Sequence, residues 1–202
     1  MARRKTQSET ELAPAREARE ALSRLTDENA LLRAALAEAR AQLGEAEENA
    51  GRDPLTALLD PRQFRAELER VLSQAARHGT PAALLSVELN DLKSINDGHG
   101  RIAGDAALRH VARLLKSLIR ASDVAARNGG GAFSLLLDHL DADSALDTAE
   151  RIARCIAAHP LDIGHAMVKL EAIVSAATIM PGDTVEEVLR RAARNRERVK
   201  EF

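Results

Sequence analysis

Two charged side chains stand three residues apart, shortly before a run of glycines, in the stretch RASDVAARNGGGAF (120–133). The planar guanidinium of Arg120 can donate to two acceptors on one edge of a purine or stack on its face, and the carboxylate of Asp123 can accept from the ring N–H donors. An Arg and an Asp at this spacing are equally common as solvated residues at a helix end. The glycines are typical of a tight turn, because glycine adopts positive φ freely. The stretch therefore predicts a hairpin with a candidate ligand site directly upstream.

Helices and strands alternate in the part of the chain that must position these residues. The predicted helices cover residues 61–78, 107–120, 144–159 and 185–200, and the predicted strands cover 82–90, 123–127, 133–137 and 168–179. The order is helix, strand, helix, hairpin, helix, strand, helix. This order predicts an α/β sandwich with helices packed over an antiparallel-rich sheet.

The N-terminal fifty residues have a different pattern. Residues 1–14 are polar and are expected to be a disordered leader. Residues 15–51 repeat apolar side chains in heptads, which predicts a dimeric coiled coil. The a positions are Ala15, Leu22, Asn29, Leu36, Leu43 and Ala50, and the d positions are Ala18, Leu25, Leu32, Ala39 and Ala46. A single Asn at position a favours a parallel two-stranded register, although a lone amphipathic helix folded onto the domain is the alternative.

Composition narrows the classes of partner. The net charge of −2 provides no general attraction to nucleic acid or to an anionic membrane. Three Phe and no Trp or Tyr leave little for stacking on bases. Cys155 is the single cysteine, so no internal disulfide can form. No apolar run approaches the roughly 18 residues of a membrane span, and we expect a soluble, cytoplasmic protein.

Four stretches, in order and at matching spacing, resemble the motifs of the GGDEF domain, the diguanylate cyclase family. They are DPLTALLDPRQF (53–64), ELNDLKSINDGHGRIAGD (88–105), RASDVAARNGGGAF (120–133) and EEVLRRAARNRERVKEF (186–202). The resemblance covers residues 52–202 and implies a ferredoxin-like α/β sandwich, which agrees with the predicted order of elements. The family joins two GTP molecules into cyclic di-GMP, with one GTP on each of two facing domains.

The resemblance implies a GTP site in this chain. The family recognises guanine through an Asn and an Asp, which correspond to Asn96 and Asp105, and binds phosphates through lysines that correspond to Lys93 and Lys200. Taken alone, Asn96 is equally typical of a turn and Asp105 of a helix start, where its charge is favourable. The lysines are equally typical of a solvated surface.

The catalytic end departs from the family pattern. The family holds its metals through a strand Asp and the third residue of GGDEF, and the following Glu assists the chemistry. Here the strand residue is Glu88, and the signature reads Gly129, Gly130, Gly131, Ala132 and Phe133. Glu88 is a doubtful, vestigial metal ligand, because Mg²⁺ is held through carboxylates and tolerates poor geometry badly. Loss of a proton-transferring Glu alone costs about 10²–10⁴ in rate, so the signature predicts no useful turnover and no required cofactor.

The product-binding residues, in contrast, are all present. The family's inhibitory R-x-x-D element corresponds to Arg120 and Asp123, and a secondary Arg in an A-E-R-I context corresponds to Arg151. The resemblance thus implies that cyclic di-GMP is clamped by these three side chains between two domains.

These observations predict a catalytically inactive GGDEF-domain protein that acts as a dimeric cyclic di-GMP effector and signals to an unidentified protein partner. Three alternatives remain open. One is a GTP sensor that uses Asn96, Asp105 and the two lysines without turnover. Another is a coiled-coil scaffold that binds no nucleotide. The last is an enzyme with residual diguanylate cyclase activity in the presence of Mg²⁺ or Mn²⁺.

Overall fold

The structure is a computed structural model that describes residues 24–40, 51–90 and 92–200. The chain divides into two units at the boundary between Ala50 and Gly51. In the first unit, residues 24–40 form a helix that is exposed along its whole length. The expected leader (1–14) and the remaining parts of the expected coiled coil (15–23 and 41–50) lie outside the described residues.

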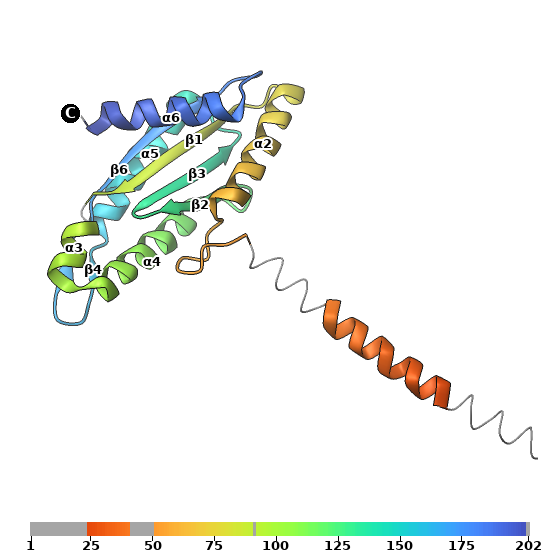
Figure 1. The fold of residues 1–202 in the computed structure, drawn as a ribbon. Helices are drawn as coiled ribbons and strands as arrows, with labels where there is room; N and C mark the ends of the chain where they lie inside the picture. The colour runs from red at the N-terminus through yellow and green to blue at the C-terminus, as the bar shows by residue number, and fades with distance from the viewer. Residues whose placement is uncertain (1–23, 41–50, 91, 201–202) are drawn as a thin grey trace, which may run out of the picture. The chain divides into compact units, whose positions relative to one another are not determined.

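The second unit is built on a four-stranded antiparallel sheet in the order β2-β3-β1-β6 (Figure 1). Its strands are β1 (Ala82–Leu89), β2 (Val124–Gly129), β3 (Ala132–Asp138) and β6 (Ala172–Ile179). A separate small hairpin pairs β4 (Leu161–Asp162) with β5 (Met167–Val168). β1 is an inner strand, between β3 and β6, so its C-terminal end has a neighbouring strand on each side.

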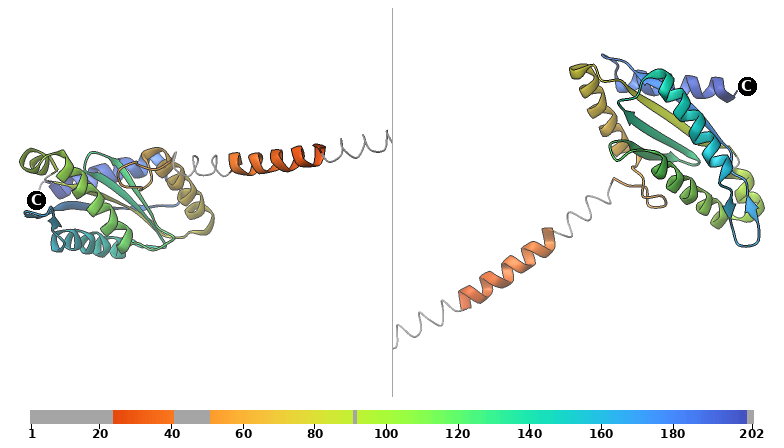
Figure 2. Two further views of the ribbon diagram at one scale, coloured as in Figure 1. Left: turned by 90° about the horizontal axis from the view of Figure 1, so that it is seen from below. Right: turned by 180° about the vertical axis from the view of Figure 1, so that it is seen from behind.

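Helices cover both faces of the sheet (Figures 1 and 2). They are α2 (Pro61–His78), α3 (Leu92–His99), α4 (Arg101–Leu118), α5 (Ala142–Ala158) and α6 (Val185–Lys200). Successive side chains of a strand point to opposite faces. Leu84 accordingly packs in the core under α2 and α6, whereas Leu85 packs in the core under α4 and α5. The predicted α/β sandwich is confirmed.

Two predicted elements differ from the structure in their bounds. The helix predicted over 107–120 is α4, which begins at Arg101 and follows the short, unpredicted α3 directly after Gly100. Gly100 has a φ of 83°, which interrupts a pattern that is otherwise helical on both sides. The strand predicted over 168–179 divides into β5 and β6, because the chain leaves the small hairpin at Val168 and places Leu170 in the core before it enters the sheet.

Across the three described ranges, no helix combines the length and the apolar composition that crossing a membrane requires.

Candidate functional site

The glycine turn connects β2 to β3 and lies beside the end of β1. Gly129 and Gly130 have φ values of 102° and 53°, which L side chains rarely adopt, so the turn requires glycine at both positions. Gly131 has no such backbone requirement, and its carbonyl accepts a hydrogen bond from the N–H of Leu89 at 2.9 Å. A Cβ atom at position 131 would lie 3.1 Å from the Leu89 carbonyl oxygen. A side chain at this position would therefore project from the turn only after a small shift of the neighbouring backbone.

The two positions after the turn have different roles. Ala132 pairs with Glu88 across the β1–β3 ladder, so the position that corresponds to the family's catalytic Glu directly faces the expected metal ligand. Phe133 is only 1 % exposed and belongs to the core under α4 and α5. The structure thus brings the degenerate signature and Glu88 together, as the resemblance implies.

Glu88 is engaged by two cations of α6. Lys200 Nζ donates to Glu88 Oε1 at 3.0 Å and lies 2.9 Å from Oε2. Arg196 Nε lies 3.4 Å from Oε2, close enough for an ion pair, although this buried nitrogen makes no hydrogen bond. Lys200, expected to bind phosphate, therefore contacts the expected metal ligand. Arg196 was not predicted from the sequence, where it is one of several arginines in a basic helix.

The residues at this end of the sheet do not fit a magnesium site. No group of three or more His, Cys, Asp or Glu within residues 24–40, 51–90 and 92–200 could hold a metal ion. Glu88 faces Ala132 instead of a second carboxylate, and its charge is already offset by Lys200 and Arg196. Because Mg²⁺ requires oxygen ligands in near-octahedral geometry, we derive no chemical step through a metal.

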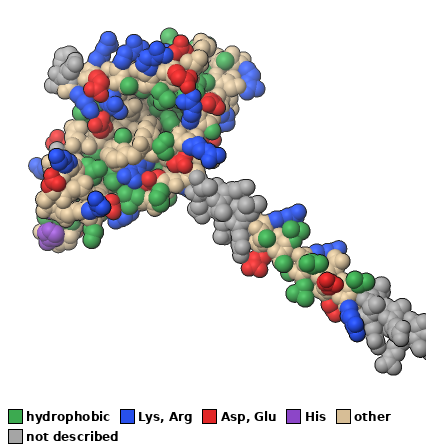
Figure 3. All heavy atoms as spheres, viewed as in Figure 1, with side chains coloured by type: hydrophobic (Ala, Val, Ile, Leu, Met, Phe, Trp, Pro, Cys, Tyr) green, Lys and Arg blue, Asp and Glu red, His purple; other side chains and the backbone are tan. Residues whose placement is uncertain are grey.

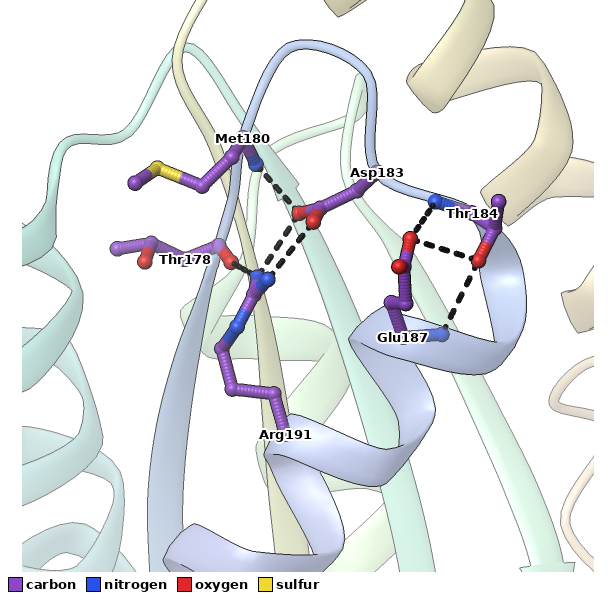
Figure 4. Close-up of polar contacts among 6 residues, drawn as sticks. All are labelled: Thr178, Met180, Asp183, Thr184, Glu187 and Arg191. Atoms are coloured by element: carbon purple, nitrogen blue, oxygen red, sulfur yellow. Dashed lines mark hydrogen bonds and ion pairs between the residues drawn. The ribbon is translucent and has the colours of Figure 1, made fainter.

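The helix α6 is anchored at its N-terminal end by polar contacts, which thereby help to position Arg196 and Lys200 (Figure 4). Arg191 donates to both carboxylate oxygens of Asp183, at 2.7 and 2.8 Å, and also to the Thr178 carbonyl of β6. The hydrogen bonds from Arg191 lower the pKa of Asp183, against the opposing effect of burial. Thr184 and Glu187 exchange hydrogen bonds in a capping box, in which the Glu187 N–H donates to Thr184 Oγ1. In the space-filling view, Lys and Arg side chains gather over this helix (Figure 3).

The expected guanine-recognition residues lie on α3 and α4. A Cβ atom at Gly104 would stand only 2.0 Å from Asn96 Oδ1, so the Asn96 side chain lies directly against the α4 backbone at this glycine. Asp105 follows Gly104 and is half-buried. Neither alternative interpretation agrees with the structure, because Asn96 lies inside α3 and Asp105 lies beyond the first turn of α4. Lys93 is exposed at the beginning of α3.

The three residues expected to bind cyclic di-GMP lie at the opposite end of α4. Arg120, Asp123 and Arg151 all line one hollow of about 60 Å³ between the ends of α4 and β3 and the helix α5. Asp123 Oδ2 accepts from the Arg120 N–H at 2.8 Å, and Oδ1 accepts from the Asp138 N–H at 3.3 Å. Arg151 Nη2 donates to the Leu118 carbonyl at 3.5 Å. Asp123 therefore also stabilises the turn that carries Arg120.

The size of this hollow limits what it can do alone. Pockets that enclose a small ligand usually measure about 300–1,000 Å³. A hollow of about 60 Å³ cannot enclose a dinucleotide. It can offer Arg120 and Arg151, which are exposed, together with the carboxylate of Asp123. A ligand held there would need to be covered from outside, by more of this domain or by a second one.

Arg127 connects the glycine turn to the segment where the domain begins, a link that sequence reasoning missed. Its Nη1 donates to Asp53 Oδ2 at 2.9 Å, and its Nε and Nη2 donate to the Gly130 carbonyl at 3.3 and 3.1 Å. Asp53 Oδ1 accepts from the backbone and the hydroxyl of Thr56. Burial raises the pKa of Asp53, but hydrogen bonds from Thr56 and the nearby Arg127 outweigh it, and the pKa is lowered. The signal available in the sequence was the position of Asp53 and Arg127 inside two of the four motifs.

This domain is similar to known proteins in sequence and in fold. The family model "Diguanylate cyclase, GGDEF domain" matches residues 50–201. The response regulator PleD of Caulobacter vibrioides is 34 % identical over 143 residues, which are 69 % of this chain and 32 % of PleD. The diguanylate cyclase DosC of Escherichia coli is 37 % identical over 102 residues, 50 % of this chain and 22 % of DosC. The chain thus spans a third or less of the length of these relatives.

Two solved structures are also similar to this chain. The coiled coil and GGDEF domain of DgcB from Caulobacter crescentus, solved in complex with c-di-GMP, has a TM-score of 0.80 and is 26 % identical, covering 89 % of this chain and 93 % of that one. The diguanylate cyclase SiaD from Pseudomonas aeruginosa, solved with its activator SiaC, has a TM-score of 0.73 and is 25 % identical, covering 98 % and 76 %.

Proposed function

The chain belongs to the diguanylate cyclase GGDEF-domain family, and we propose that it is a member without cyclase activity that functions by binding cyclic di-GMP. The observation that carries this proposal is the convergence of Arg120, Asp123 and Arg151 on one hollow. Arg120 and Arg151 are exposed cations that can donate hydrogen bonds to guanine or stack on its ring, and Asp123 can accept hydrogen bonds from the N–H donors of guanine. The complex of the similar DgcB domain with c-di-GMP supports the choice of ligand.

Residues at the other end of the sheet support the proposed lack of cyclase activity. Gly131 and Ala132 carry no carboxylate where the family has two. The remaining acid, Glu88, is paired with Lys200 and Arg196 and is therefore a poor ligand for a divalent metal. We expect no cyclic di-GMP from GTP after prolonged incubation with Mg²⁺ or Mn²⁺, as measured by chromatography. Product formation above a no-protein control would contradict the proposal.

The described part of the N-terminal helix supports dimerisation. Leu25, Leu32 and Leu36 fall on the expected a and d positions and are 59 %, 62 % and 51 % exposed in the single chain. A row of exposed leucines at this spacing is typical of a coiled-coil seam. A homodimer would bring two domains together, which the small hollow needs in order to cover its ligand. SiaD is bound to a protein activator in its solved structure, and we extend the proposal to a protein partner for this chain.

A GTP sensor is the second candidate function. It is favoured by one observation, the contact of the Asn96 side chain with Gly104, the residue that precedes Asp105. Such a sensor would bind GTP without turnover. Binding of GTP that is lost on Asn96→Ala and retained on Arg120→Ala would favour it over the effector.

The deciding experiment is isothermal titration calorimetry of the full chain with cyclic di-GMP and, in parallel, with GTP. We expect micromolar or tighter binding of cyclic di-GMP, weakened about 10- to 100-fold by Arg120→Ala or Arg151→Ala, because each removes charge-assisted hydrogen bonds. Arg154→Ala is the matched control, since Arg154 is exposed on the same helix as Arg151 and does not line the hollow. No heat from cyclic di-GMP, with a response to GTP, would move the function to the Asn96 site. No heat from either would leave a scaffold.

A further inference from the structure

A second, larger hollow adjoins the one lined by Arg151. It measures about 290 Å³ and shares Ile119, Arg120 and Asp123 with the smaller hollow. Its other charged side chains are Arg52, from the beginning of the domain, and Lys116, from the last turn of α4. We call it the basic hollow. Its remaining lining is apolar: Leu58, Leu59, Ala121, Val124 and Ala125.

Two cations that line the basic hollow converge on one neutral atom, a carbonyl oxygen of Ala57, a residue that lines a neighbouring hollow. Arg52 Nη1 donates to the Ala57 carbonyl oxygen at 3.1 Å, and Lys116 Nζ donates to the same oxygen at 3.4 Å. These hydrogen bonds hold both side chains in place, although Arg52 and Lys116 belong to segments that are distant in the sequence. A carbonyl satisfies hydrogen bonds but does not neutralise charge, so the pair retains its attraction for an anion.

The cations of the basic hollow outnumber its acids. Within the part of the chain that the structure describes, no ion pair involves Arg52, Lys116 or Arg120. Asp123 is the one acid in the lining, so the hollow keeps a net positive charge. Three cations around a partly apolar hollow fit a ligand that joins an anionic group to a flat, poorly hydrated ring.

We propose that Arg52 and Lys116 bind a phosphodiester group of the cyclic dinucleotide whose guanine contacts Arg120 and Asp123. The inference rests on the proposed function and adds two binding residues to it. Arg120 lines both hollows, so one ligand can place its base in the smaller hollow and its charged backbone in the basic hollow. Together the hollows offer a volume in the range of ordinary ligand pockets, which the smaller one alone does not.

The test compares cyclic di-GMP affinities of the full chain and of variants by isothermal titration calorimetry. We expect Arg52→Gln and Lys116→Gln each to weaken binding about 10-fold, because each removes a charge-assisted contact with a phosphate oxygen. Lys116→Arg should remain within about 3-fold of the wild type, because it keeps the charge. Arg113→Gln is the matched control and should leave the affinity unchanged, since Arg113 is exposed on the same helix but lines a different hollow.

The outcomes separate this inference from the proposed function. Binding that Arg120→Ala abolishes but Arg52→Gln and Lys116→Gln leave unchanged would overturn the inference and leave the function intact. Equal losses in Arg113→Gln would also overturn it, because they would reflect general charge rather than the basic hollow. No binding by the wild-type chain would overturn both. The thermal unfolding midpoint of each variant shows whether a loss of affinity comes from a loss of fold.

Discussion

Ala57 has a φ of 55°, in the left-handed region that L side chains rarely adopt. Its N–H donates to the Asp53 carbonyl, and its own carbonyl accepts from Arg52 and Lys116. The turn is therefore held in a strained conformation by contacts on both sides. Glycine at this position would carry no such strain.

We expect Ala57→Gly to stabilise the protein by about 0.5–1 kcal/mol. Relief of the left-handed conformation is worth about 1–2 kcal/mol, and the greater freedom of glycine in the unfolded chain offsets about half of it. Urea unfolding followed by circular dichroism measures the change. Ala121→Gly, at an exposed position without positive φ, is the control and should not stabilise the chain.

Gly104→Ala should destabilise the protein by about 1–3 kcal/mol, a typical cost of overpacking a close contact. The new Cβ atom would stand 2.0 Å from Asn96 Oδ1 and force that side chain away from α4. Gly98→Ala is a matched control, because Gly98 lies inside the neighbouring α3 and a Cβ there would meet nothing within 4 Å. The same unfolding measurement applies, and equal effects of the two substitutions would show that the Asn96 contact is unimportant.

Among the elements, α6 determines the chemistry at the end of β1, because it delivers Arg196 and Lys200 to Glu88. It also protects the open edge of the sheet. Asn195 donates to the Ala176 carbonyl at 2.8 Å, and Arg191 donates to the Thr178 carbonyl. These contacts satisfy backbone groups of β6 that would otherwise be available to another strand. The contact of Arg191 with Asp183 anchors α6 in this position at its N-terminal end.

The contribution of this anchor depends on pH. The pKa of Asp183 is lowered in the folded chain, chiefly by its hydrogen bonds with Arg191. A carboxyl with a lowered pKa stabilises the fold above its unfolded pKa of about 3.8 and loses that contribution as the pH falls through its folded pKa. We expect Asp183→Ala to cost about 1.5–3 kcal/mol at pH 7, the usual value of hydrogen bonds to a charged group. In denaturant titrations, the difference from wild type should shrink below pH 4, and a constant difference would contradict the assignment.

At the scale of the whole molecule, the described N-terminal helix and the domain are separate units. The helix offers a row of exposed leucines. Its proposed role is to bring a second copy of the domain into reach. A second domain could cover a ligand from outside, which the smaller hollow of about 60 Å³ cannot do alone.

Charges placed in the leucine row should therefore abolish dimerisation. We expect the double substitution Leu32→Glu and Leu36→Glu to produce a monomer in sedimentation velocity, because each dimer would bury four carboxylates at its seam. Leu31→Glu is the control, since Leu31 is 72 % exposed but lies outside the a and d positions. A wild-type chain that is monomeric at all accessible concentrations would exclude the coiled-coil proposal.

At the level of the sequence, local patterns were sufficient to identify the family and to predict most of the helices and strands. Turn glycines, the short apolar run of β1 and the helical spacing in α2, α5 and α6 depend on neighbours in the sequence, and the structure has them where they were predicted. Four motifs in order also identified Arg120, Asp123, Arg151, Asn96 and Asp105 as candidates. The short helix α3 and the first part of α4, which lie on the two sides of Gly100, were not predicted.

Tertiary structure alone decided which of these side chains meet. Glu88 and Lys200 are 112 residues apart, yet they form an ion pair that changes a phosphate-binding candidate into a partner of the expected metal ligand. Lys116 reaches the carbonyl oxygen of Ala57, 59 residues away in the sequence, to which Arg52 also donates. Sequence spacing determines proximity only within one element or one turn, because beyond that the packing of helices on the sheet determines the distances. The sequence by itself therefore determined the fold and the candidate residues, and the packing decided how they are grouped into sites.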